Sequence, residues 1–431
     1  MNIFYSIFLL IFLLPTYLFS QNPVPAEKQS KRILITGGTL HIGNGEVITN
    51  GVVGFDNGKI ILVGDASVIR IDRAAYDTVI DISGKHVYPG LIAMNTTIGI
   101  NEIEAVRATN DINETGALNP SVRSVVAYNT DSKVIPTIRS NGILLAQIVP
   151  GGGLVSGQSS VMELDGWNYE DAVYHVDEGV HVRWPSMRKL KHAKEDADEK
   201  QQQRIESELQ QIRKLFTDAR AYSLIQSPVE KNIHLESLRG LFNGSKTIYI
   251  HCNFVKEIIA ASGLCSDLGM KMVLVGGTDA LLVAELLKSK NIPVVLVKTH
   301  RLPSRDDEAV DMPFTLPAKL RDAGVTYAIA VDEFWQVRNL GFHAGTAVAH
   351  GLSKEEALTA LTLTPAEIMG IHKRVGSLEQ GKDATFVIAS GDLLDMKSAT
   401  VEVAFIGGKQ IDLDNIQTQL DRKYRKKYGL K

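Results

Sequence analysis

The chain has 431 residues, of which 44% are hydrophobic and 22% are charged, and its formal net charge is -3. A chain of this length and composition can bury a large core and hold a barrel-sized domain beside a smaller one. The nearly balanced charge excludes the strongly basic or acidic character that is typical of proteins binding nucleic acids or acidic partners.

The first twenty residues are apolar and aromatic, are interrupted by Pro15, and are followed by a polar run from Gln21. This pattern predicts a signal peptide over residues 1–20, and therefore an exported protein, periplasmic or secreted. An uncleaved membrane anchor is the alternative, but the run is short beside the roughly 20 residues of a spanning helix. No cysteine stands near the cleavage region, so we do not expect a lipoprotein.

Residues 31–87 have the pattern of short β-strands separated by glycine-rich turns, including the hairpin turn Asp56-Asn57-Gly58. After the Pro89-Gly90 turn, apolar strands alternate with helical stretches. Strands are expected at residues 91–97, 143–149, 247–251, 271–275 and 292–297. This alternation is typical of βα units and a parallel sheet.

Residues 184–224 interrupt the alternation with a charged stretch that is almost free of glycine and proline. Ile205, Leu209, Ile212 and Phe216 recur at helical spacing, which predicts an amphipathic helix or helix pair inserted into the barrel. Its charged face is either simply solvated or binds a partner.

The stretch YPGLIAMNTTIG at residues 88–99 resembles the first barrel strand of the amidohydrolase superfamily, which reads PGLID-x-H-x-H. The stretch GSLEQGKDA at residues 376–384 closely resembles the imidazolonepropionase-like branch, and the resemblance covers about residue 31 to residue 412. It implies an α/β fold with a (β/α)8 TIM barrel over residues 88–370. It also implies a composite β-sandwich from residues 31–87 and 371–412, with a basic tail over residues 413–431.

The metal ligands of that family are only partly present. Two histidines at i and i+2 of a strand share a face and can meet one ion, but here Asn95 and Thr97 stand in their places. The resemblance implies His251 and Asp332 as metal ligands and Asp332 as the catalytic proton acceptor. It also implies a divalent metal such as zinc, held by an incomplete site or absent altogether.

Other side chains are expected around the same pocket. Asn95 and Thr97 lie at the end of the first barrel strand, and His300 with Arg301 follows a later strand, either on the pocket rim or in a solvated loop. His251 has two interpretations: a metal or substrate contact, or a barrel-mouth histidine bonded to a neighbour. Cys252 and Cys265 are the two cysteines, and they are either a disulfide or two buried thiols.

Two functions remain open. The first is hydrolysis of non-peptide carbon–nitrogen bonds, such as those of cyclic amides or dipeptide-like substrates. The second is an exported, catalytically impaired relative that binds a small ligand or pairs with an active homologous subunit. The expected partners are a small molecule and either a second copy or such a homologue, with no nucleic acid. A fold does not decide between these functions, because function depends on the site.

Overall fold

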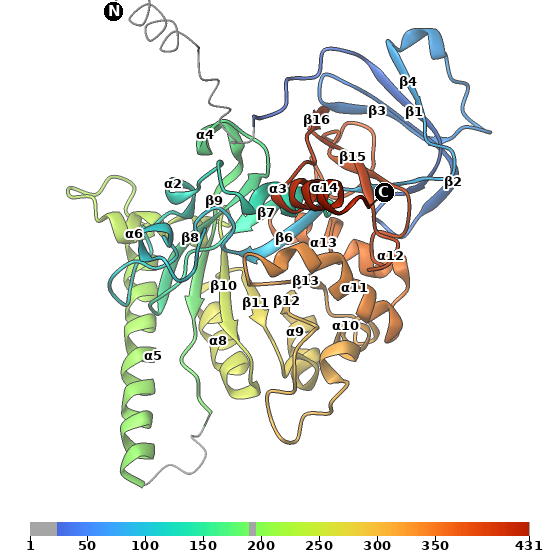
Figure 1. Cartoon of the computed structure of the whole chain (residues 1–431). Helices are drawn as coiled ribbons and strands as arrows, with labels where there is room; N and C mark the ends of the chain where they lie inside the picture. The colour runs from blue at the N-terminus through green and yellow to red at the C-terminus, as the bar shows by residue number, and fades with distance from the viewer. Residues whose placement is uncertain (1–23, 189–194, 431) are drawn as a thin grey trace, which may run out of the picture.

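The computed structural model describes residues 24–188 and 195–430, so the predicted signal peptide lies outside the described residues. Two eight-stranded sheets, sheet A and sheet B, organise the molecule. Figure 1 shows sheet B at the centre with helices beside it, and sheet A at one side, built from both ends of the chain.

Sheet B is the barrel, and its strands follow the chain in the order β13-β12-β11-β10-β9-β8-β7-β6. Its strands are β6 (Leu91–Thr96), β7 (Ile143–Ile148), β8 (Val155–Glu163), β9 (Val173–Arg183), β10 (Thr247–Cys252), β11 (Met272–Gly276), β12 (Val294–Val297) and β13 (Tyr327–Ala330). The predicted TIM-barrel fold class is confirmed. One strand departs from the all-parallel pattern, because β8 pairs antiparallel with both β7 and β9.

The barrel is nearly closed between its first and last strands. The Ile92 N–H donates to the Leu361 carbonyl (2.9 Å), and the Ile329 N–H donates to the Ala360 carbonyl (3.1 Å). These two carbonyls follow α12 (Lys354–Thr359) and satisfy the facing edges of β6 and β13. An edge that would otherwise expose backbone donors is thereby covered.

Helices surround the barrel because each crossover between parallel strands must return along the outside. The longer ones are α8 (Val255–Leu268), α10 (Met312–Asp322) and α11 (Leu340–Ala349). The shorter ones are α2 (Ser124–Ala127), α3 (Val134–Arg139), α4 (Tyr169–Ala172), α6 (Ile233–Ser237), α7 (Gly240–Asn243), α9 (Ala284–Ser289) and α13 (Leu363–Ile368). Apolar side chains of strands and helices form one continuous core.

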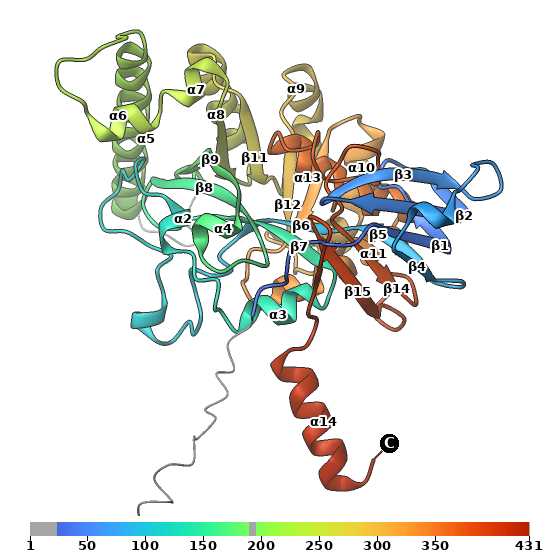
Figure 2. The ribbon, with the colours of Figure 1, turned by 90° about the horizontal axis from the view of Figure 1, so that it is seen from above.

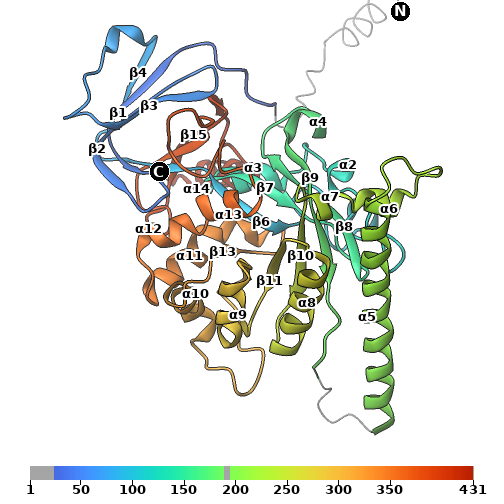
Figure 3. The ribbon, with the colours of Figure 1, turned by 180° about the vertical axis from the view of Figure 1, so that it is seen from behind.

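The charged stretch forms the helix α5 (Glu195–Ser223), 29 residues long and therefore about 43 Å in length. Ile205, Ile212 and Phe216 are buried on one face, as their spacing predicts. Figure 3 shows α5 beside the barrel strands, with its first turns reaching beyond the body of the molecule.

Sheet A combines β1 (Ile33–His41), β2 (Val47–Asp56), β3 (Lys59–Asp65), β4 (Thr78–Asp81) and β5 (His86–Pro89) with β14 (Phe386–Ala389), β15 (Val401–Ile406) and β16 (Lys409–Ile411). The two ends of the chain meet where β5 pairs antiparallel with β14. Phe55, Phe386 and Phe405 pack ring against ring in a second core. The expected composite domain is thus built around its own apolar centre.

The described chain ends in the helix α14 (Ile416–Tyr428). Its first turn is fixed to α3, where the Thr137 hydroxyl donates to Gln417 (2.6 Å) and the Asn415 amide donates to Ser140 (3.0 Å). The rest of α14 projects from the molecule (Figure 2). Among the described residues, no helix combines the length and apolar character that crossing a bilayer requires.

Candidate functional site

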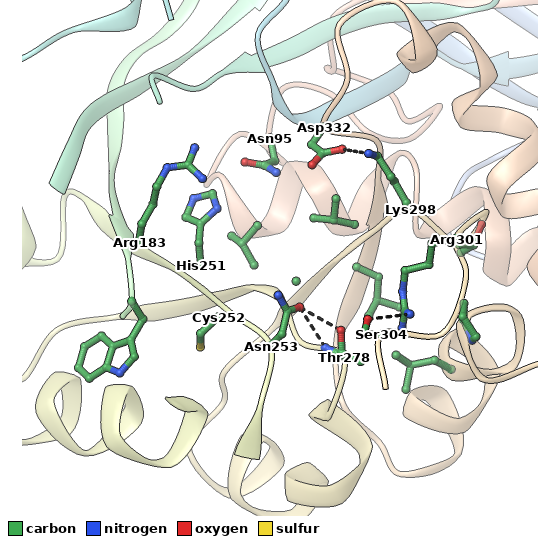
Figure 4. Close-up of a pocket in the computed structure, with 18 of the residues that line it drawn as sticks. Asn95, Arg183, His251, Cys252, Asn253, Thr278, Lys298, Arg301, Ser304 and Asp332 are labelled. Carbon is green, nitrogen blue, oxygen red and sulfur yellow. Dashed lines mark hydrogen bonds and ion pairs between the residues drawn. The ribbon is translucent and has the colours of Figure 1, made fainter. Parts of the chain in front are cut away.

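A cavity of about 580 Å³ opens at the carboxyl ends of the parallel barrel strands, where barrel folds place their functional groups. Figure 4 shows its polar side chains, which come from the ends of β6, β9, β10, β12 and β13. The residues that line it are Asn95, Thr97, Val149, Arg183, Trp184, His251, Cys252, Asn253, Val275, Gly276, Thr278, Leu296, Val297, Lys298, Thr299, Arg301, Ser304, Pro313, Leu316 and Asp332.

Asn95 lies at the end of β6 with a left-handed backbone, φ +54°. Asparagine tolerates this conformation better than most residues do. Its N–H donates to the Gln147 side-chain oxygen on β7 (3.0 Å), which holds the turn in place. The first of the two family histidine positions is therefore occupied by a neutral amide on a kinked strand end.

His251, at the end of β10, is hydrogen-bonded to another histidine. Its Nε2 lies 2.9 Å from Nδ1 of His181, and Nε2 of His181 lies 2.8 Å from the Ser159 hydroxyl. Burial, together with the nearby Arg183 cation, lowers the pKa of His251 to about 3. Burial, His251 and Arg183 also hold the pKa of His181 well below its usual value. Both rings are therefore neutral at pH 7.

The series of hydrogen bonds from His251 through His181 and Ser159 ends at a buried carboxylate inside the barrel, Glu178. Glu178 is 3% exposed and accepts hydrogen bonds from Gln147 (2.7 Å), Ser159 (2.5 Å) and Tyr249 (2.8 Å). Burial raises the pKa of Glu178, while these three donors act against that rise. Since Ser159 donates its proton to Glu178, His181 must donate to Ser159 and His251 must donate to His181.

Asp332 follows β13 and is paired with a lysine of the neighbouring strand end. Lys298 Nζ lies 3.0 Å from Asp332 Oδ1 and 2.5 Å from Glu333 Oε1. Burial alone would lower the pKa of Lys298, but hydrogen bonds to Glu333 and Asp332 outweigh it and raise that pKa. The side chain of Asp332 is 44% exposed in the cavity mouth, so this carboxylate already has an internal counter-cation.

Two arginines also line the cavity, and they differ in their partners. Arg301 pairs with Glu308 (2.6 Å) and also donates to the Ser304 hydroxyl. Arg183, the last residue of β9, has no side-chain hydrogen bond or ion pair within residues 24–188 and 195–430. In Figure 4 its guanidinium lies beside His251. Burial lowers the pKa of Arg183, and Asp332 opposes that shift.

The remaining residues expected at the site are distributed unevenly. Thr97 and Arg301 line the cavity, whereas His300 does not. The His300 ring stacks on His343 with centroids 4.0 Å apart, and its Nε2 contacts Thr346. The left-handed backbone of Lys298, φ +59°, turns the chain before His300, which explains why this side chain leaves the pocket.

The strand end after β11 carries glycine where the family places another histidine. Gly276 has φ +99°, and a Cβ atom there would lie 2.6 Å from the Asn253 side-chain oxygen. That oxygen accepts a hydrogen bond from the Thr278 hydroxyl (3.1 Å), which links the loops after β10 and β11. A side chain at this position would therefore be strained by the left-handed backbone and would have to displace the Asn253 amide.

The residues present do not form the metal site that the family would hold here. In the described part of the chain, no group of three histidine, cysteine or carboxylate side chains is placed to hold an ion. His251 Nε2 is bonded to His181, Asp332 is bonded to Lys298, and Asn95 and Thr97 offer uncharged oxygens or an amide nitrogen. Catalytic zinc sites use three protein ligands, and this donor set supplies too few.

Comparison with known proteins gives the family. A sequence profile described as the amidohydrolase family matches residues 190–411, just over half of the chain. The chain belongs to the amidohydrolase family. Amidohydrolases characteristically use a divalent metal, so the donor set at this cavity marks a divergent member.

Individual relatives agree with the family and with the fold. Imidazolonepropionase of Geobacillus kaustophilus (strain HTA426) is 24% identical over 79% of this chain and 84% of that protein. Amidohydrolase tasK of Hapsidospora irregularis is 31% identical, but the match spans only 28% of this chain and 13% of that protein. The crystal structure of an amidohydrolase from Thermotoga maritima MSB8 superposes with a TM-score of 0.75 at 24% identity, over 88% of this chain and 99% of that one.

Three features of the cavity in this amidohydrolase-family protein were not predicted from the sequence. Arg183 was missed because residues 173–183 were not recognised as a strand, although the apolar alternation around Val180 and Val182 was available as a signal. Lys298 directly follows a predicted strand. Barrel folds place their functional groups at the carboxyl ends of the strands, so Lys298 could have been placed at the barrel mouth from the sequence. The contact of His181 with His251 had no local signal, because the two residues are 70 positions apart.

Proposed function

We propose that this amidohydrolase-family protein binds a small anionic molecule at the barrel mouth without a metal ion. One observation carries the proposal: Arg183 places a guanidinium in the cavity with no anionic partner in the described part of the chain. The side chain of Arg183 is exposed at the cavity, so an anion that enters from solvent can reach the guanidinium and pair with it. The cavity volume of about 580 Å³ fits a small organic ligand.

The pairing of the other cavity cations supports Arg183 as the contact for an anionic ligand. Lys298 and Arg301 also line the cavity, but each is already paired with a carboxylate, so among the described residues Arg183 is the lining cation that is left for a ligand. A carboxylate could accept hydrogen bonds from the planar guanidinium in a two-pronged geometry.

The test is a calorimetric titration of the purified protein, in buffer containing a chelator, with succinate and with its neutral diamide as a matched probe. We expect the dianion to bind and the diamide to bind at least about tenfold more weakly, since a charge-assisted hydrogen bond contributes about 1.5–3 kcal/mol. Arg183→Met should abolish this preference. Arg213→Met, which removes an exposed arginine from α5, is the control and should retain it. Equal binding of both probes would contradict the proposal.

Hydrolysis of a non-peptide carbon–nitrogen bond is the second candidate, favoured by the position of Asp332 at the end of β13. In that reaction a water oxygen would attack the carbonyl carbon and the C–N bond would break. Asp332 would accept the water proton and return it to the leaving nitrogen. Turnover of cyclic amides by the chelated protein, lost in Asp332→Asn, would favour hydrolysis over binding alone.

A further inference from the structure

The helix α14 carries a surface that the cavity does not explain. Every residue of Ile416–Tyr428 is exposed. One stripe of the helix is apolar and aromatic, with side chains repeating every four residues so that they share one face. The apolar stripe consists of Ile416, Leu420, Tyr424 and Tyr428, each at least 42% exposed.

Basic side chains border this apolar stripe. The helix has five basic residues and one acidic residue, in a chain whose net charge is -3. Arg422 pairs with Asp414 and Arg425 pairs with Asp421. The other three basic residues have no carboxylate partner in the described part of the chain: Lys423, Lys426 and Lys427.

The aromatic and basic groups lie against one another. The Tyr424 and Tyr428 rings stack with centroids 6.5 Å apart. Lys427 Nζ lies 5.0 Å from the Tyr428 ring centre, and Lys423 Nζ lies 5.8 Å from the Tyr424 ring centre. Tyrosine with lysine beside an apolar stripe is the composition of helices that lie in the headgroup region of a bilayer.

We propose that α14 docks on a membrane surface that carries anionic lipid headgroups. The unpaired lysines supply the charge complementarity, and the apolar stripe supplies area to bury among the headgroups. The position of the helix permits such contact, because only its first turn is fixed to α3 and the remainder projects from the body (Figure 2). A second copy of this chain would fit the surface of α14 less well, because two such basic helices would repel each other.

The experiment is co-sedimentation of the full chain with phosphatidylcholine vesicles that contain or lack phosphatidylglycerol, at low and high salt. We expect the anionic vesicles to bind the protein and high salt to release it. The triple variant Lys423→Gln, Lys426→Gln, Lys427→Gln should bind about 100-fold more weakly, from the electrostatic contribution of each basic residue. Leu420→Ser with Tyr424→Ser should also weaken binding by at least about tenfold.

The control is the triple variant Lys200→Gln, Arg213→Gln, Lys214→Gln, which removes the same charge from exposed positions of α5 and should bind as the unmodified chain does. All variants have the same N-terminal segment, so any contribution of that segment to vesicle binding is the same in each. A difference in binding between the two triple variants therefore comes from α14. Equal binding to neutral and anionic vesicles would overturn the proposal, as would equal loss in both triple variants. Sedimentation without vesicles would instead indicate self-association and would also overturn it.

Discussion

Acidification should destabilise this protein through histidines that are held neutral. His251 and His343 each have a pKa lowered to about 3. The cause at His251 is burial and then Arg183, and at His343 it is burial and then His300 and Lys298. The unfolded chain has an ordinary histidine pKa near 6.5, so below that pH it binds more protons than the folded chain. Stability from this source is therefore complete above pH 6.5 and is lost as the pH falls toward 3.

The magnitude follows from the pKa difference. At pH 5, each histidine is about 1.5 pH units below its unfolded pKa, which corresponds to about 2 kcal/mol of lost unfolding free energy per residue. The assay is urea unfolding at pH 7.5 and at pH 5, followed by circular dichroism. His343, which lies away from the cavity lining, is the site of the test variant. His343→Gln should reduce the pH-dependent loss by about 2 kcal/mol, because it removes one of the buried histidines that must take up a proton.

A variant at a histidine that is exposed rather than buried provides the control, and His234 is such a residue. His234→Gln should leave the pH dependence as it is in the unmodified protein. An unfolding free energy that is equal at the two pH values would refute the reasoning. The same conclusion would follow if His343→Gln and His234→Gln changed the pH dependence equally.

Three further predictions concern the stability of the barrel. Tyr249→Phe should lower the unfolding free energy by about 1.5–3 kcal/mol in urea titrations. The reason is that Glu178 Oε2 accepts a hydrogen bond from the Tyr249 hydroxyl and from no other donor among the described residues. An unchanged unfolding midpoint would contradict this prediction. Asn95→Ala should cost about 1 kcal/mol and Asn95→Gly much less, since alanine is strained at φ +54°; equal melting temperatures would contradict this. Treatment with a strong chelator should leave the melting temperature unchanged, whereas a fall of several degrees would reveal a structural ion.

Much of the fold could be predicted from the sequence because its signals are local. The apolar run at residues 143–149 and the Pro-Gly turn before Leu91 predict barrel strands at their observed positions. The spacing of Ile205, Ile212 and Phe216 predicts the buried face of α5. In contrast, β8 contains Gly157 and three serines, which weaken any strand signal, and its antiparallel pairing depends on neighbours that the sequence does not reveal.

The site was less predictable, because its decisive contacts join distant strands. The replacements at Asn95 and Thr97 are visible in the sequence, and both residues line the cavity. The pairing of Asp332 with Lys298 depends on the adjacency of β12 and β13 and on the left-handed backbone at Lys298. That same backbone turn moves His300 away from the cavity, which no periodic pattern indicates.

We propose above all that this amidohydrolase-family protein has a barrel mouth without a metal ion. Elemental analysis of the purified, dialysed protein tests it most directly, beside the double variant His251→Ala, Asp332→Ala. We expect zinc, iron and manganese well below one ion per chain in both proteins, because His251 and Asp332 are already bonded to His181 and Lys298. Near-stoichiometric metal in the unmodified protein, lost in the double variant, would contradict the claim.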